Sequence, residues 1–469
     1  FFDDESALAW VLVLRQAPLA VDDQLDRHRA AHRVFGRRGD GFVKRIGVQA
    51  VGVVVGGDQR RQGGGGSGER GGEWGYCEPA GRSKEWSRRP RQRVVVRREV
   101  QNAERAGDTA LLAQLRNDYG YDGIDTCAVD GMCQTACPVN INTGDLVRRL
   151  RQEDKGAVEQ AVWKAASKHW GAIAHTGGAA LTVARATPTS MVTGATRLGR
   201  AILGADTVPL YAGDLPRGGG KRRPLSATDA VAVYFPACIG TMFGPARGGQ
   251  GVSDAFLALC RRADVKVMTP DGIGALCCGT PWKSKGFAAG YEQMTGSVLP
   301  ALWAVSRHGE LPIVCDAASC TEGLHTMRDL AARGGGPFAR LRFVDAIEFI
   351  HDHVLDRLKV TAPVASIALH PTCSSTHLGT NAMMTAIASV ISPDVYLPID
   401  WGCCGFAGDR GLLHPELTAS ATAAEAAEIN RREFAAYASS NRTCELGLTR
   451  ATGHEYQHLI ELLEQATQQ

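Results

Sequence analysis

The sequence predicts an α/β protein whose C-terminal half is a duplicated module built on a parallel sheet. Two observations lead to this prediction. From about residue 225 onward, short β-rich runs alternate with helix-prone runs, which is typical of parallel α/β sheets. One arrangement of cysteines and glycines then occurs twice, which indicates an internal repeat.

The elements of the first repeat follow one another at short intervals. Strands are expected at 230–235, 265–268 and 311–314, and helices at 253–262 and 291–306. The pattern starts again at 366–369. It continues with a strand at 395–399 and a long Ala-rich helix at 416–437. We therefore predict a first module at 225–360 and a second at 361–469.

Three groups of residues define the repeat, and the two copies are separated by 135, 126 and 124 positions. Chance alone does not account for so many matches at similar separations. The matched residues are Pro236, Cys238 and Gly244 with Pro371, Cys373 and Gly379; Cys277, Cys278 and Gly279 with Cys403, Cys404 and Gly405; and Cys320, Gly323 and Leu324 with Cys444, Gly447 and Leu448.

In each module one cysteine follows a strand end, an adjacent pair follows the next strand end, and a fourth opens a later loop. Strand ends meet at one edge of a parallel sheet, where ligand sites form. Thiolates hold iron–sulfur clusters or zinc, so each set predicts a metal site. The alternative, buried free cysteines, suits Cys260 and Cys315, which have no counterpart in the other copy. The predicted ligands are Cys238, Cys277, Cys278 and Cys320 in the first module and Cys373, Cys403, Cys404 and Cys444 in the second.

A small helical domain is expected at 71–215, because 90–150 and 158–203 are helix-prone, with a break at Gly177 and Gly178. The polar, glycine-rich stretch 216–224 is typical of an inter-domain linker. It is not a phosphate-binding loop, since Lys221 is followed by Arg222 instead of a hydroxyl residue.

A further cysteine loop lies within the helical part. Cys127, Cys133 and Cys137, followed by Pro138, have the spacing of the ferredoxin run C-x2-C-x2-C-x3-C-P, with Asp130 at the second ligand position. Two interpretations of Asp130 remain open. Its carboxylate either ligates iron or caps the loop.

The remaining features restrict the class of protein. The net charge of +3 over 469 residues argues against a nucleic-acid binder, and no apolar run is long enough to span a bilayer. The 14 cysteines are clustered and no secretion signal is present, which favours metal ligation over disulfides and predicts a cytoplasmic protein. Residues 1–70 are expected to be poorly ordered or misread, and a start at Phe1 suggests a fragment.

The C-terminal half resembles the CCG, or cysteine-rich, domain family, known from heterodisulfide reductase subunits and from the C-terminal parts of glycolate and D-lactate dehydrogenases. In the fullest family pattern the last cysteine belongs to a CxxC pair, but Ala317 and Asn441 stand at the earlier positions here. Each module thus keeps four thiols. The stretches that carry the resemblance are YFPACIGTMFG at 234–244, CCGTPWKSKG at 277–286, HPTCSSTHLG at 370–379, WGCCGFAGDRG at 401–411 and SNRTCELGLTRATG at 440–453.

The stretch YDGIDTCAVDGMCQTACPVNINTG at 121–144 resembles the ferredoxin-like loop of flavin-linked D-lactate dehydrogenases. In that family an earlier cysteine run precedes it. Here only Cys77 remains of that run, with Gly71, Trp74 and Gly81 where the other cysteines would stand. The resemblance therefore implies a degenerate ferredoxin-like domain.

Together these resemblances imply an iron–sulfur electron carrier, with 4Fe-4S clusters, of a D-lactate or other 2-hydroxy-acid dehydrogenase. FAD would belong to a partner domain or subunit, because this chain contains no recognisable flavin domain. A quinone or cytochrome would accept the electrons, and contact with the inner face of the cell membrane is compatible with this role. Two alternatives remain: a zinc-stabilised scaffold, and a thiol–disulfide enzyme similar to heterodisulfide reductase.

Overall fold

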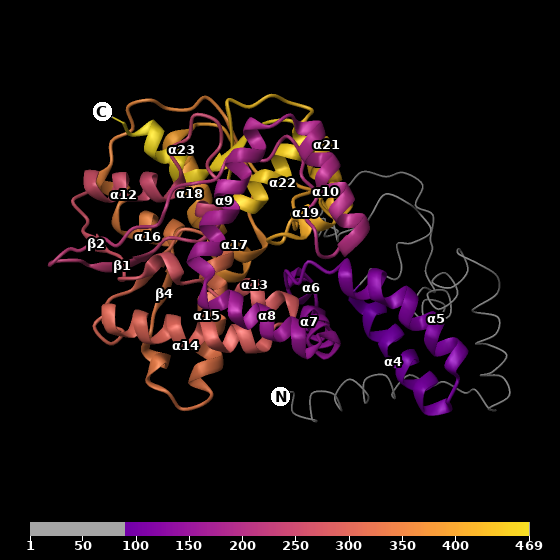
Figure 1. Cartoon of the computed structure of the whole chain (residues 1–469). Helices are drawn as coiled ribbons and strands as arrows, with labels where there is room; N and C mark the ends of the chain where they lie inside the picture. Colours follow the sequence, from indigo (N-terminus) through magenta and orange to yellow (C-terminus); the bar gives the residue numbers. More distant parts are fainter. Residues whose placement is uncertain (1–89, 469) are drawn as a thin grey trace. The chain divides into compact units, whose positions relative to one another are not determined.

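The computed structural model describes residues 90–468 (Figure 1). The segment 1–70 and Cys77 lie outside the described residues. Residues 90–203 are helical, as the sequence predicts. Their helices are α4 (Pro90–Ala106), α5 (Thr109–Tyr119), the π-helix η1 (Gly120–Asp125), α6 (Met132–Thr135), α7 (Thr143–Asp154), α8 (Ala157–Lys168), α9 (Trp170–Ala186) and α10 (Thr189–Leu203).

Helix α9 continues through Gly177 and Gly178, where the sequence predicts a break. The reason is packing: a Cβ at Gly178 would lie 2.5 Å from the carbonyl oxygen of Thr241. Glycine thus allows the helix to approach the first module closely.

Two four-stranded parallel sheets follow, and they have the same strand order. The first is β2-β1-β3-β4 and the second β6-β5-β7-β8, with every pairing parallel. The structure thus confirms two similar parallel-sheet modules. The strands are β1 (Ala232–Phe235), β2 (Val267–Met268), β3 (Ile313–Cys315), β4 (Phe343–Asp345), β5 (Ile367–Leu369), β6 (Val395–Tyr396), β7 (Ala436–Ser439) and β8 (Tyr456–His458).

Helices connect these strands. In the first module they are α11 (Ile239–Met242), α12 (Val252–Arg262), α13 (Thr280–Lys285), α14 (Ala288–Val305), α15 (Ala318–Ala332) and α16 (Ala346–His353), with 3-10 turns η2 (Ile273–Ala275), η3 (Pro337–Arg340) and η4 (Leu355–Arg357). In the second they are α17 (Cys373–Leu378), α18 (Asn381–Ile391), α19 (Arg410–Leu413), α20 (Pro415–Ala421), α21 (Ala423–Ile429), α22 (Arg442–Thr452) and α23 (Leu459–Ala466).

The long helix predicted at 416–437 is wrong. The chain forms α20 and α21, which end at Ile429, and then enters β7, a strand inside the sheet. Alanine has a high intrinsic helix propensity, but Ala436–Ser439 is buried as a strand between β5 and β8. Tertiary pairing overrides the local preference here.

The linker at 216–224 is packed instead of free. A Cβ at Gly219 would lie 1.8 Å from the carbonyl oxygen of Gly240, and one at Gly218 would lie 2.1 Å from that of Gly178. The Gly219 N–H also donates to the Thr241 carbonyl at 3.0 Å. The linker is therefore fixed against α9 and the first module.

One hydrophobic core serves both modules. It combines Phe256 and Ile347 of the first module with Ile387 and Leu463 of the second. The contacts run from α12 to α23 and from α16 to α18 (Figure 1).

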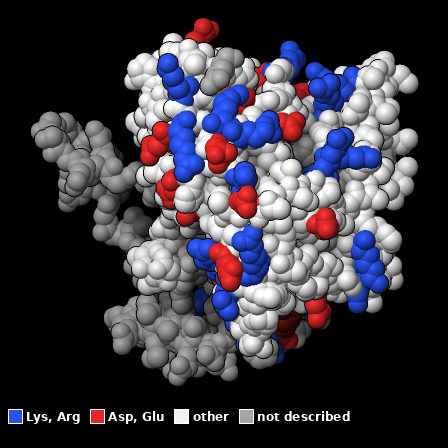
Figure 2. Space-filling model, turned by 90° about the vertical axis from the view of Figure 1, so that its left-hand side faces the viewer, with Lys and Arg blue, Asp and Glu red and all other residues white. Residues whose placement is uncertain are grey.

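On the face shown in Figure 2, basic and acidic side chains are interspersed. Among the described residues, no helix combines the length and the apolar character needed to cross a membrane.

Candidate cysteine sites

The predicted cysteines of the first module lie where its strands end. Cys238 comes three residues after β1, Cys277 and Cys278 follow η2, and Cys320 is in the first turn of α15. All four are buried, and the Sγ atoms of Cys238 and Cys277 are 3.6 Å apart. The fold thus brings together residues that are up to 82 positions apart in the sequence.

Among the thiols of this set, Cys278 has the most strongly lowered pKa. Hydrogen bonds from Cys277, and then from Cys320, lower the pKa of Cys278 well below its usual value, and Thr280, whose Oγ1 lies 3.3 Å from the sulfur, adds to this effect. Burial, and then hydrogen bonds with Cys238 and Cys278, hold the pKa of Cys277 well above its usual value. Hydrogen bonds within this buried group thus favour the thiolate form of Cys278, while the pKa values of Cys277 and Cys320 are raised.

Cys315 adds a fifth thiol to the first set. The sequence assigns it to the core, and it is fully buried at the end of β3, but its side chain also hydrogen-bonds with Cys320. The equivalent position of the second module, five residues before Cys444, is Ser439. The two sets are therefore not identical.

Arg222 of the linker supports the first set, and sequence reasoning missed it. Its guanidinium donates to the carbonyls of Pro236 at 3.1 Å and of Gly274 and Leu276 at 2.9 Å. These bonds fix the loops that precede Cys238 and Cys277. A hydrogen bond from Cys277 is the main cause that lowers the pKa of Cys238; burial opposes it, and the Arg222 charge contributes further.

The second module arranges its thiols in a similar way. Cys403, Cys404 and Cys444 are buried, and Cys373 is half-buried at the start of α17. The Sγ atoms of Cys404 and Cys444 are 3.0 Å apart. Hydrogen bonds from Cys403, and then from Cys444, lower the pKa of Cys404 well below its usual value. Cys404 therefore has the role that Cys278 has in the first set.

A buried histidine–glutamate pair distinguishes the second set. His370 Nδ1 is 2.7 Å from Glu425 Oε1, and both side chains are at most 2% exposed. Burial disfavours the charged form of His370. The charge of Glu425 and its hydrogen bond to the ring outweigh this effect, so the pKa of His370 is raised. The His370 Nε2 has no hydrogen-bond partner among the described residues, and the His370 charge helps to lower the pKa of Cys404. Phe235 stands at the equivalent place in the first module.

The two sets are joined by polar contacts between their helices. Glu322 of α15 accepts from Ser374 at 2.7 Å through one oxygen, and its other oxygen lies 3.1 Å from His377 Nδ1. Asn441 donates to Ser319 at 3.0 Å. These residues are close in sequence to Cys320, Cys373 and Cys444, so α15, α17 and α22 meet near both sets.

The loops after the cysteine pairs also meet. Lys285 Nζ and Asp409 Oδ2 are 2.6 Å apart. Trp282 is fully buried and donates to the Trp163 carbonyl. Trp282, Lys285 and Asp409 therefore make contacts within the chain.

The ferredoxin-like loop packs against this region. Asp130 accepts from the Met132 N–H at 3.3 Å, which is the capping role that the sequence leaves open. Cys127 accepts from the Val129 N–H and Cys133 from the Thr143 hydroxyl, both at 3.4 Å, while Cys137 is half-buried.

Two contacts hold the loop against the modules. A Cβ at Gly131 would lie 2.7 Å from the ring of His377. Buried Arg151 donates to the carbonyls of Ile124 and Cys127 and to that of Ser284, each at 2.8 Å. The loop is thus tied to both cysteine modules.

Within residues 90–468, no three His, Cys, Asp or Glu side chains converge as a ready site for a single metal ion. Sulfur–sulfur contacts of 3.6 and 3.0 Å join Cys238 with Cys277 and Cys404 with Cys444. The donor chemistry of each module nevertheless suits an iron–sulfur cluster, because soft, buried thiols from separate loops are the ligands such clusters use.

The comparison with protein families agrees with this chemistry. Residues 367–449 match the family model CCG, a cysteine-rich domain. The CCG match includes all four cysteines of the second set, and this type of domain is found in iron–sulfur proteins similar to heterodisulfide reductase. The first module has the same strand order, which makes it CCG-like. No curated protein matches the chain.

Proposed function

We propose that this chain carries electrons through iron–sulfur clusters bound by the cysteines of its two modules. The observation that carries this proposal is the repetition of one buried thiol set at the strand ends of two sheets with the same order. If the cysteines were buried only as small apolar side chains, they would not need to occupy matching positions in both modules. When bound, an iron–sulfur cluster exchanges single electrons.

The protein residues would define the environment of each cluster. Cys238, Cys277, Cys278 and Cys320, with Cys315 beside them, would bind in the first module. Cys373, Cys403, Cys404 and Cys444 would bind in the second. Burial excludes water, and the charges of Arg222 and His370 favour anionic sulfur nearby.

The contacts between the sets support a relay role. Glu322 and Asn441 link helices that carry cysteines of different modules, and the 127–137 loop packs beside them. Electrons could then pass between neighbouring centres without leaving the protein. The loop around Cys127, Asp130, Cys133 and Cys137 would supply a further, incomplete centre.

In its wider role, we propose that the chain serves a flavin-linked 2-hydroxy-acid dehydrogenase of the D-lactate or glycolate type. The support is the resemblance of residues 121–144 and of the CCG stretches to those enzymes. A flavin domain or subunit would donate electrons, and a quinone or cytochrome would accept them. Contact with the cytoplasmic face of a membrane would suit a quinone acceptor.

The test is anaerobic analysis of iron, acid-labile sulfide and zinc in the full chain, with a visible spectrum. We expect iron and sulfide in similar amounts. Cys278→Ser and Cys404→Ser should each lose the iron of one module, whereas Cys260→Ala, a buried cysteine outside both sets, should retain both. Zinc without iron would overturn the proposal and favour the scaffold.

A second candidate is direct thiol–disulfide exchange, favoured by the 3.0 Å contact between Cys404 and Cys444 and by the lowered pKa of Cys404. A thiolate next to a second thiol is the arrangement that this chemistry requires. Disulfide reduction by the iron-free, reduced chain would support this candidate. Retention of that activity in Cys404→Ser would refute it.

A further inference from the structure

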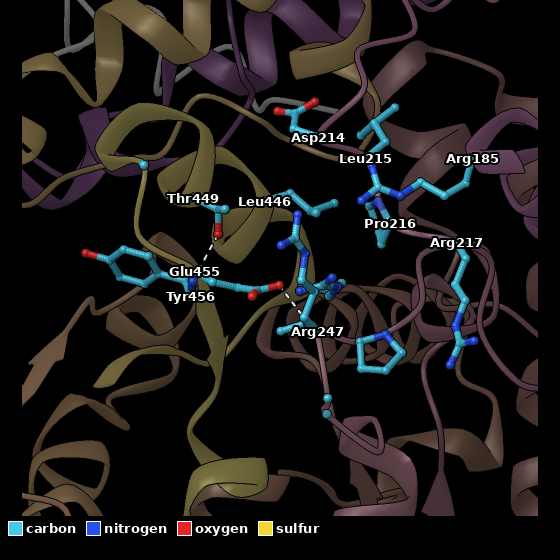
Figure 3. A pocket seen from close by; sticks show the side chains of 16 residues that line it. Arg185, Asp214, Leu215, Pro216, Arg217, Arg247, Leu446, Thr449, Glu455 and Tyr456 are labelled. Atoms are coloured by element: carbon cyan, nitrogen blue, oxygen red, sulfur yellow. Dashed lines mark hydrogen bonds between the residues drawn. The ribbon is translucent and has the colours of Figure 1, made fainter. Parts of the chain in front are cut away.

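A pocket of about 680 Å³ lies where the helical region meets both modules (Figure 3). Arg185 of α9, residues 214–217 at the start of the linker and the loop 245–249 form part of its wall. The second module contributes one face of α22 and residues 453–456 at β8. The pocket therefore draws on parts of the chain that are far apart in sequence.

Four arginines line this pocket: Arg185, Arg217, Arg247 and Arg442. The guanidinium groups of Arg217 and Arg247 have no hydrogen bond or ion pair with any residue in 90–468. Arg442 donates through Nη1 to Glu445 at 2.9 Å, but its Nε is buried without a partner. Several strong donors are thus left for a ligand.

The two acidic residues of the wall offset only part of this charge, because four arginines stand against two carboxylates and Asp214 is paired with an arginine outside the lining. Asp214 forms two hydrogen bonds with Arg450, at 2.6 and 3.0 Å. Glu455 accepts from the backbone N–H of Arg247 at 2.6 Å, the bond drawn in Figure 3. The remaining charge in the pocket is positive.

We propose that this pocket binds a small molecule with two or more carboxylate or phosphate groups. Guanidinium groups match the paired oxygens of both anions, and the volume lies in the range of small-molecule sites. Leu215, Pro245 and Leu446 add apolar wall for the rest of the molecule. The proposal is independent of which metal the cysteines bind.

Helix α22 connects this pocket with the second cysteine set. Arg442, Leu446 and Thr449 face the pocket at helical spacing, whereas Cys444 contacts Cys404. A bound anion that accepts a hydrogen bond from Arg442 would change the surroundings of Glu445, which also hydrogen-bonds with Arg442 and is next to Cys444. The ligand thus has a direct route to influence this set.

The experiment is isothermal titration calorimetry of citrate and, separately, of pyrophosphate into the purified full chain at low salt. The Arg217→Ala/Arg247→Ala double variant should bind at least ~10-fold more weakly, because it removes two charged hydrogen-bond donors from the pocket. The control is Arg261→Ala/Arg340→Ala, which removes the same charge from exposed positions outside the pocket. It should bind within about 2-fold of the native chain, since long-range charge effects are small and screened.

Tighter binding of citrate would identify a carboxylate ligand, and tighter binding of pyrophosphate a phosphate ligand; either supports the pocket. The proposal is overturned if neither anion binds at millimolar concentration. It is equally overturned if the control weakens binding as much as the pocket variant does. Binding of anionic lipid vesicles without either small anion would also refute it.

Discussion

At the scale of single residues, the two modules cap equivalent helices with different ionisable groups. Asp345 is the last residue of β4 and accepts from the Ile347 N–H at 3.0 Å; His458 is the last residue of β8, and its Nδ1 accepts from the Ile460 N–H at 3.2 Å. Both side chains are buried. Burial raises the pKa of Asp345 to about 7 and lowers the pKa of His458 to about 4.

These shifts predict opposite effects of pH on stability. Below the unfolded pKa of Asp345, about 3.9, its contribution is fully present, and it is lost as pH rises through the folded value near 7. The contribution of His458 is present above its unfolded pKa of about 6.5 and is lost as pH falls through about 4.

We therefore expect the free energy of unfolding of Asp345→Asn to rise more steeply with pH between pH 4.5 and 6.5 than that of the native chain. The free energy of unfolding of His458→Asn should rise less steeply over the same range. Each slope should change by up to about 1.4 kcal/mol per pH unit. Asparagine retains an oxygen that can cap the helix. Urea unfolding of the three proteins across this range checks the prediction, and parallel curves would contradict it.

Sequence reasoning predicts the cysteines of the candidate sites but not the residues that pack around them. Repeated spacing identifies Cys278 and Cys404, because both copies are visible in one chain. Arg222, Cys315 and the His370–Glu425 pair have no repeated signal, since Arg222 lies in the linker and the others have no counterpart in the other copy of the repeat. Glu425 is 55 residues from His370, and only the folded chain brings the two together.

At the scale of elements, α15 and α22 each place a glycine three residues after a cysteine, but the two glycines face different neighbours. A Cβ at Gly323 would lie 2.5 Å from Thr280 Oγ1 and 3.2 Å from Cys278 Cβ. A Cβ at Gly447 would lie no closer than 3.2 Å to a methyl group of Thr418. The first glycine is thus needed more strictly than the second.

Gly323→Ala should destabilise the protein by about 1–3 kcal/mol, because overpacking at this contact exceeds the gain in helix propensity. Displaced Thr280 would also cease to support Cys278. Gly447→Ala should change stability by less than about 1 kcal/mol, since helix propensity offsets its milder contact. Urea unfolding and the rate of thiol modification measure both effects; a larger loss in Gly447→Ala would contradict this account.

The strands were predictable from sequence because β1 and β5 are buried apolar runs that precede cysteine loops. The course of 416–437 was not. Its alanines favour a helix over the whole stretch, but Ala436–Ser439 forms strand β7 of the second sheet. Local propensity cannot reveal a pairing with β5, which lies more than 60 residues earlier.

At the scale of the whole molecule, the shared core makes the modules interdependent. Sequence repetition predicts two units, but α18 and α23 of the second module pack on α16 and α12 of the first. Arg262 of α12 also forms an ion pair with Glu464 of α23, which is 3% exposed. Because the modules share one buried apolar cluster through these helices, the two should unfold together.

Ile387 of α18 tests this coupling, as it is fully buried in the shared core. Ile387→Ala should cost about 2–5 kcal/mol through the cavity it leaves. Hydrogen-exchange mass spectrometry should show equal losses of protection in β1 and β5, although only β5 belongs to the mutated module. Val390→Ala is the control, since Val390 lies in the same helix but is 49% exposed. If protection falls in β5 while β1 remains unchanged, the modules are energetically independent and the common core does not couple them.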